Sequence, residues 1–232
     1  MLGALMYFML WLPLNICRVL WWNWKIEGSE NLPPRPQGCV LAVNHLNWTD
    51  IHILGASLPL SHRPWWIAKV ELFGNRLLAW WLRQMQVIAI RRGKRDLTAL
   101  LAGEEALKSG AALVIFPEGH RSRTGQLQEG KSGAVRLSVR SEVPIIPIAI
   151  FGTEAGLKGA ATRKPIRIRI GKPYQPVVEN PDHIPAEQME LLTDEMMLRI
   201  AELMPEQYWG HYREKMQLQL QSGARAEIAQ RV

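Results

Sequence analysis

Short, continuous apolar runs recur along the chain, and stretches of helical periodicity separate them. A continuous run bounded by turn residues is typical of a strand that is buried on both faces of a sheet. Strands that alternate with helices predict an α/β domain with a largely parallel twisted sheet and helices on both faces. The predicted strands are Trp24–Glu27, Cys39–Val43, Trp65–Ala68 (ending at Lys69), Val87–Ile90, Ala112–Phe116, Ile145–Phe151 and Ile166–Ile170.

Two of the predicted helices begin at polar residues. Thr49 is the candidate N-cap of a helix that starts at Asp50 and runs to about Ser57. Asp96 is the candidate cap of a helix over Leu97–Ser109, and Gly110 ends it. Further helices are predicted at Gly133–Arg140 and Glu187–Met204.

Two segments stand apart from this simple pattern. Leu72–Met85 is helical in period but too apolar for an ordinary surface helix, so it is either core or a second element that dips into a membrane. Ile166–Ile170 alternates isoleucine with arginine, as an edge strand with one wet face does.

The N-terminal segment has no charged side chain before Arg18. Met1–Trp24 is just long enough to span a bilayer, and its pattern is not that of a cleaved signal peptide. Pro13 can kink a single span or join two short helices that dip into one leaflet, and the tryptophan cluster favours the dip. Arg18 and Lys25 predict that the remainder lies on the cytoplasmic face.

The prolines of Asn31–Gly38 indicate a connector. A second boundary is predicted at Pro205, because the chain is polar beyond it. The predicted parts are a membrane-associating helical segment over residues 1–30, a main domain over residues 31–205 and a polar C-terminal tail over residues 206–232. The total of 232 residues suits one domain with a full core.

The net charge of +7 predicts an anionic partner, which can be nucleic acid, a lipid surface or a phosphorylated substrate. The 10 tryptophans change this picture, because indole prefers the membrane–water boundary. The sequence therefore favours a lipid bilayer over nucleic acid. Cys17 and Cys39 lie in apolar runs, which predicts two reduced thiols, and the scattered histidines predict no metal site.

Polar residues with chemical potential follow three of the predicted strands. His45 follows Cys39–Val43, Arg91 and Arg92 follow Val87–Ile90, and the Glu118–Arg121 loop follows Ala112–Phe116. In an open parallel sheet these strand ends lie along one edge, where sites form. A neutral imidazole that accepts a proton, a carboxylate (Asp50) that orients it and arginines that clamp a phosphate together suit the deprotonation of a hydroxyl on a phosphorylated substrate.

Each of these features has a simpler interpretation by itself. A histidine five residues before an aspartate also fits a structural histidine that bonds to a helix start. The basic run over residues 91–95 fits a solvated turn or a contact with lipid headgroups. Glu118 and Gly119 alone fit a turn that carries a charge.

Taken in order, the motifs resemble those of the glycerolipid acyltransferases typified by 1-acylglycerol-3-phosphate acyltransferases. The family's Asn-His-x4-Asp motif corresponds to Asn44–Asp50, its Phe-Pro-Glu-Gly-Thr-Arg-Ser motif to Phe116–Ser122, and its Val-Pro-Ile-Ile-Pro motif to Val143–Pro147. The second family motif is only partly present in Val87–Arg92. The resemblance covers about Asn44–Pro173 and implies a fold like that of glycerol-3-phosphate acyltransferase. It also implies that the main domain over residues 31–205 is the acyltransferase domain.

The resemblance also implies roles for individual residues. His45 is the general base on the acceptor hydroxyl, and Asp50 orients it. The acceptor's glycerol phosphate is bound by Arg92, Glu118, Gly119 and Arg121. Attack is direct on an acyl thioester of coenzyme A or acyl carrier protein, without an acyl-enzyme and without a metal or other cofactor. Lys69, at the end of its strand, is the candidate donor to the oxyanion.

Two departures from the family pattern bear on the acceptor. His120 replaces the usual threonine, and Arg91 replaces an acid, so both are further candidates for substrate binding. The first hypothesis is a membrane-bound acyltransferase that makes phosphatidic acid from lysophosphatidic acid, at the inner membrane in a bacterial cell. The alternatives are an acyltransferase for another lysolipid, such as a lyso-ornithine lipid or lysophospholipid, and a catalytically idle domain that binds anionic membrane. A lipid hydrolase is a third class.

Overall fold

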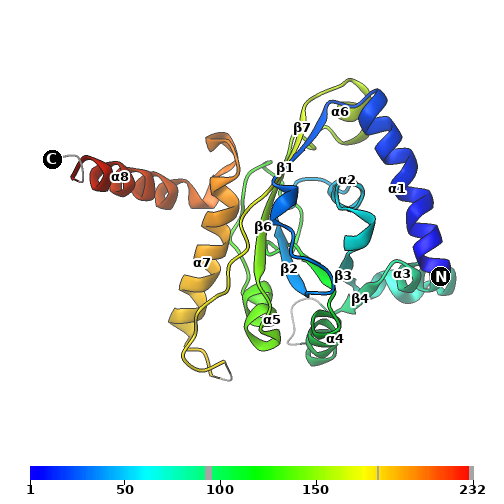
Figure 1. Cartoon of the computed structure of the whole chain (residues 1–232), viewed down its shortest axis with the longest axis horizontal. Coiled ribbons are helices and arrows are strands. Elements are labelled where there is room, and N and C mark those ends of the chain that lie inside the picture. The colour runs from blue at the N-terminus through cyan, green and yellow to red at the C-terminus, as the bar shows by residue number, and fades with distance from the viewer. Residues whose placement is uncertain (92–95, 182, 230–232) are drawn as a thin grey trace.

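The structure, a computed structural model, describes residues 1–91, 96–181 and 183–229. Within these residues seven strands form one sheet in the order β1-β7-β6-β2-β5-β3-β4 (Figure 1). Their bounds are Trp24–Glu27 (β1), Cys39–Val43 (β2), Trp65–Lys69 (β3), Val87–Ile90 (β4), Ala112–Ile115 (β5), Ile145–Phe151 (β6) and Ile166–Ile170 (β7). The strands predicted from the apolar runs are thus all present.

The sheet is largely parallel, as predicted. The five strands from β6 to β4 are mutually parallel, so their carboxyl ends share one edge. Strand β7 runs antiparallel to β6, and β1 pairs parallel with β7. The prediction of β7 as an edge strand is wrong, because β1 covers its outer side. Its arginines still keep polar partners there, since Arg169 forms an ion pair with Glu27 of β1.

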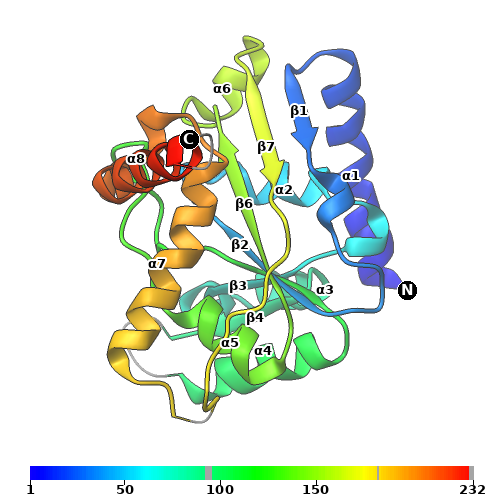
Figure 2. The same cartoon turned by 60° about the vertical axis from the view of Figure 1, so that its left-hand side comes forward.

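Helices cover both faces of the sheet (Figures 1 and 2). Alternate side chains of β2 point into two separate cores: Val40 and Ala42 into one, Leu41 and Val43 into the other. The first core is closed by α4 (Leu97–Lys108), α5 (Gly133–Ser141) and α7 (Ala186–Glu202). The second is closed by α2 (Asp50–Ser57), α1 (Leu2–Leu20) and α6 (Gly156–Ala161), and α3 (Arg76–Gln84) lies beside α1.

The predicted helix starts are in place, but one cap differs. Asp96 caps α4, because its carboxylate accepts a hydrogen bond from the Ala99 N–H. The Arg91 N–H also donates to the Asp96 carboxylate. The bond from Arg91, and after it the bond from Ala99, hold the pKa of Asp96 below its usual range. Thr49 precedes α2 as expected, yet its side chain makes no capping bond and contacts Asn47 instead. The Asp50 carboxylate instead accepts hydrogen bonds from the N–H groups of Leu46 and Asn47, which precede the helix.

Helix α1 is one continuous helix through Pro13, not two short ones. Tyr7, Trp11 and Asn15 are four residues apart and so lie on one face. They donate hydrogen bonds to the carbonyls of Gly55, Leu58 and Ala56, at 2.7, 3.0 and 2.9 Å respectively. The last carbonyls of a helix lack partners within it. Helix α1 therefore caps the C-terminal end of α2 and is packed along the domain.

The opposite side of α1 exposes an apolar stripe. It consists of Leu2, Leu5, Met9, Leu12, Ile16 and Val19, and Val19 is 72% exposed. Alternating steps of three and four residues keep these side chains on one face. The neighbouring α3 also turns apolar side chains outward, with Leu77 80% exposed and Trp80 46% exposed. Of the two predictions for Leu72–Met85, core holds for the inner face, where Ala79 and Leu82 are buried, and the exposed outer face keeps the membrane-dipping alternative open.

The C-terminal part packs more closely than a polar tail would. Trp209, Tyr212 and Met216 are buried in the core under α7, and the Trp209 indole donates to the Ala201 carbonyl at 2.9 Å. Helix α8 (Arg213–Ala229) follows and projects away from the sheet in Figure 1.

Candidate active site

The end of β2 is fixed by Asn44. Its side chain accepts a hydrogen bond from the Ile150 N–H at 2.7 Å and donates one to the Ile150 carbonyl at 2.8 Å. The amide thus continues the pairing of β2 with β6 beyond Val43. Asn44 is fully buried. Asn44 directly precedes His45, so its two bonds fix the position of the chain there. The sequence interpretation did not assign this role.

His45 and Asp50 meet as predicted. The Asp50 carboxylate oxygen Oδ2 lies 2.9 Å from His45 Nδ1 and also accepts the N–H groups of Leu46 and Asn47, both at 2.7 Å. Asp50 has no exposed surface, and His45 is nearly buried. Because Nδ1 faces a carboxylate, Nδ1 carries the proton of the neutral ring and Nε2 presents its lone pair. The pair has the geometry of a general base and its orienting group.

The loop after β5 clamps the main chain of His45. The His45 N–H donates to Glu118 Oε1 at 2.7 Å, and the Ser122 N–H donates to the His45 carbonyl at 2.7 Å. The Phe116 ring stacks on the imidazole with 4.1 Å between the ring centroids. The Phe116–Ser122 motif therefore holds the backbone and the ring of His45, and neither Phe116 nor Ser122 was predicted to do so.

Glu118 is 1% exposed. Its second oxygen, Oε2, accepts hydrogen bonds from the backbone N–H and the side-chain amide of Gln128, each at 3.1 Å. Burial raises the pKa of the Glu118 carboxyl, and the bonds from His45 and Gln128 oppose that rise. The carboxylate predicted to bind the acceptor is thus already occupied by protein N–H groups.

Gly119 has a φ of +75°, a conformation that favours glycine. A Cβ on this residue would lie 2.7 Å from the ammonium of Lys131 and 3.1 Å from its Cε. The side chain of Lys131 therefore lies across the Gly119 turn, beside the loop that holds His45. The sequence interpretation missed Lys131, and its only signal was a lysine shortly after the motif.

The other predicted cations lie along the same edge at different distances. The loop over Phe116–Ser122, which we call the clamp loop, exposes His120 and Arg121 next to Glu118. Lys69 is exposed at the end of β3, which is two strands from β2 in the sheet, so their backbones are about 10 Å apart. Arg91 directly follows β4, which lies one strand further out than β3, and its side chain is exposed. The structure does not bring Arg91 to His45, and Arg92 lies outside the described residues.

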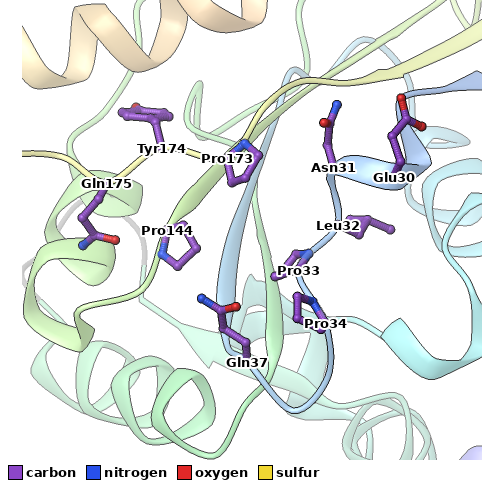
Figure 3. Close-up of a pocket in the computed structure, with 10 residues that line it drawn as sticks. All are labelled: Glu30, Asn31, Leu32, Pro33, Pro34, Gln37, Pro144, Pro173, Tyr174 and Gln175. Atoms are coloured by element: carbon purple, nitrogen blue, oxygen red, sulfur yellow. The ribbon is translucent and has the colours of Figure 1, made fainter.

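An open pocket of about 510 Å³ lies at the other edge of the sheet. Figure 3 shows its lining, which includes Pro33, Gln37, Pro144 and Tyr174. Gln37 and Pro144 precede the starts of β2 and β6, whereas His45 follows the end of β2. This pocket is separate from the His45 site.

Comparisons with known proteins agree with the motifs. A family model described as Acyltransferase matches residues 23–151. A chloroplastic 1-acyl-sn-glycerol-3-phosphate acyltransferase of Brassica napus, BAT2, is 32% identical over 185 residues, which covers 77% of this chain and 50% of the relative. A 1-acyl-sn-glycerol-3-phosphate acyltransferase of Bacillus subtilis is 29% identical over 180 residues, which covers 77% of this chain and 87% of the relative.

A solved structure is similar as well. The crystal structure of PlsC, the 1-acyl-sn-glycerophosphate (LPA) acyltransferase of Thermotoga maritima, matches with a TM-score of 0.60 at 26% identity, covering 82% of this chain and 74% of that chain. The chain spans about half the length of the Brassica relative. The family model covers more than half of the 232 residues and includes the His45–Asp50 pair. The predicted resemblance is confirmed: this chain belongs to the acyltransferase family.

Proposed function

We propose that the protein is a membrane-bound acyltransferase that moves an acyl chain from a thioester to the free hydroxyl of 1-acylglycerol-3-phosphate (lysophosphatidic acid), giving phosphatidic acid. The observation that carries the proposal is the buried His45–Asp50 hydrogen bond at the edge of the sheet. Exposed cations on the neighbouring loop and the names of the relatives support this acceptor.

His45 acts as the general base in this proposal. Its Nε2 takes the proton of the acceptor hydroxyl while the hydroxyl oxygen attacks the thioester carbonyl carbon. The new C–O bond forms, the C–S bond breaks, and the proton passes from Nε2 to the departing thiolate. Asp50 stabilises the imidazolium between these steps.

Attack on the thioester is direct, with no acyl-enzyme. In the part of the chain that the structure describes, no serine or cysteine side chain bonds to His45, and the Ser122 hydroxyl donates to the Gln126 carbonyl. General base catalysis supplies about 10²–10⁴-fold, so a donor to the oxyanion is also needed. Lys69 is our candidate for that donor. The acyl donor is acyl-CoA or acyl carrier protein, and the reaction requires no metal or other cofactor.

Cations on the clamp loop bind the acceptor phosphate. Arg121 suits a bidentate contact, His120 adds a donor, and Lys131 adds a charge across the Gly119 turn. Arg91, which follows β4, extends this positive edge. Arg92, outside the described residues, is a further candidate from the sequence alone. This set favours an acceptor with a phosphate over one without.

Helix α1 attaches the enzyme to the bilayer. Its inner face is bonded to α2, and its outer face is the apolar stripe from Leu2 to Val19, so it lies in the plane of the interface with the stripe in lipid. It is also the one described helix that is long and apolar enough to cross a membrane. Leu77 and Trp80 of α3 enlarge the lipid contact, with the domain on the cytoplasmic face.

A panel of acceptors offered with one labelled acyl-CoA tests the activity. We expect transfer to 1-acylglycerol-3-phosphate, and loss of transfer in His45→Ala. His183→Ala removes an exposed histidine outside the site and is the matched control. Transfer only to another lysolipid would show that the proposed acceptor is wrong. If neither acyl-CoA nor acyl carrier protein supported transfer to any acceptor, the alternative of a non-catalytic membrane-binding domain would be favoured. Hydrolysis faster than transfer would favour a lipid hydrolase.

Vesicle sedimentation tests the membrane contact. Replacement of Leu5 and Met9 by glutamate should release the protein from vesicles that contain anionic lipid. Leu101→Glu on α4, at the opposite face of the sheet, is the control, because Leu101 is similarly exposed. Equal binding of all variants would contradict the role of the stripe.

A further inference from the structure

We propose that Glu118 is a positioning residue that fixes the main chain of the base His45, rather than a ligand of the acceptor. The inference rests on the proposed function for the role of His45. It assigns the carboxylate of the Phe116–Ser122 motif to the architecture of the site.

The first observation is where the carboxylate oxygens point. Oε1 accepts the His45 N–H at 2.7 Å, and Oε2 accepts two N–H groups of Gln128 at 3.1 Å. With 1% of its surface exposed, Glu118 has no oxygen turned toward a substrate. A ligand of the acceptor would need an accessible oxygen.

The second observation is how completely His45 is held. Its N–H is held by Glu118, its carbonyl by the Ser122 N–H, and its ring by Asp50 and the stacked Phe116. Asp50 fixes the ring and the N–H groups of Leu46 and Asn47, which follow His45 in the chain. Glu118 supplies the restraint on the N–H of His45 itself, which lies beyond the last paired residue of β2.

The third observation is the charge. The acceptor phosphate is an anion, and a buried carboxylate repels it. Burial raises the pKa of the Glu118 carboxyl, which means that burying its charge costs free energy. The hydrogen bonds from His45 and Gln128 offset part of that cost. Bonds from Gln128 also connect Glu118 to the following segment, which leads to Lys131. Glu118 therefore links the base to the loop that carries the cations.

Two conservative variants separate position from charge. Glu118→Gln keeps an acceptor oxygen within reach of the His45 N–H, but it loses the charge and the acceptor for the Gln128 N–H groups. Glu118→Asp keeps the charge and loses the reach. We expect kcat to fall by about tenfold or more in Glu118→Asp and by less than about fivefold in Glu118→Gln, with the acceptor KM within about threefold of wild type in both.

Hydrogen exchange of the His45 amide, followed by NMR, is independent of any substrate. It should be faster by about tenfold or more in Glu118→Asp and close to wild type in Glu118→Gln. An acceptor KM raised by about tenfold with kcat retained, or wild-type exchange in Glu118→Asp, would overturn the proposal. If the wild type shows no transfer, the proposed function fails, while the exchange measurement still decides whether Glu118 holds His45.

Discussion

Asn44 and Ile150 exchange two hydrogen bonds through one side chain, at 2.7 and 2.8 Å. A side-chain amide can replace a backbone amide in a strand ladder because it carries one acceptor and a donor in similar geometry. The pairing of β2 with β6 therefore continues into the residue before His45. The two bonds therefore hold the backbone of β6 to the residue directly before His45.

Asn44→Ala should destabilise the protein. The substitution leaves the buried N–H and carbonyl of Ile150 without partners, which costs about 1–3 kcal/mol for each group. We expect a lower unfolding temperature and a loss of kcat, measured by thermal unfolding and by acyl transfer. Asn44→Asp keeps an acceptor for the Ile150 N–H but loses the donor to the Ile150 carbonyl, so its unfolding temperature should also lie below that of wild type. An Asn44→Ala protein as stable as wild type would contradict this account.

Asp50→Asn should lower kcat by about 10²–10⁴-fold. The amide is neutral, so it stabilises the imidazolium of His45 far less than the carboxylate does. The effects of two residues that act as a unit are not additive. In the His45→Ala background, Asp50→Asn should therefore reduce the residual rate very little. Independent, additive losses in the double variant would show that the two residues do not act together.

Lys131→Met should raise the acceptor KM by about tenfold while kcat stays within about threefold, because a charge contact with the phosphate is lost in ground and transition states alike. Lys108→Met on α4 has the same change of charge on an exposed lysine outside the site and is the control. The test is a titration of 1-acylglycerol-3-phosphate at a fixed donor concentration. Equal KM values in the two variants would exclude a specific role for Lys131.

The apolar runs predicted the strands well because burial on both faces of a parallel sheet requires continuous apolar residues. The edge assignment of β7 failed for a physical reason. Alternating isoleucine and arginine predicts one polar face, but that face can be satisfied by water or by a partner such as Glu27 on β1. The alternation of isoleucine and arginine is the same for a strand whose polar face meets water and for one whose polar face meets another strand.

The site was predictable where its residues are close in sequence, and less so where they are distant. His45 and Asp50 are five residues apart, and their contact follows from a helix that starts at Asp50. The bond from His45 to Glu118 joins residues 73 positions apart, so only the folded chain shows it. Likewise, the apolar composition of α1 predicted a membrane segment, but the bonds from Tyr7, Trp11 and Asn15 to α2 required the structure.

Cys39 should resist thiol reagents in the folded protein. It has no exposed surface, and burial raises the pKa of its thiol to about 12, with the charge of Arg35 partly opposing the rise. The thiolate is the reactive form, and at pH 8 only about one buried thiol in 10⁴ is ionised. In a Cys17→Ser background, which removes the more accessible cysteine of α1, we expect negligible labelling by maleimide at pH 8 and rapid labelling in denaturant.

The same shift gives a dependence of stability on pH. A thiol whose pKa is higher in the folded than in the unfolded protein contributes stability that is fully present below the unfolded value, near 8.5, and is lost as the pH rises toward 12. The free energy of unfolding should therefore decline above about pH 8.5. The decline should be smaller in Cys39→Ala, which lacks the titrating group, once the constant cost of the cavity is subtracted. Parallel curves for the two proteins between pH 8 and 10 would show that Cys39 does not titrate on unfolding.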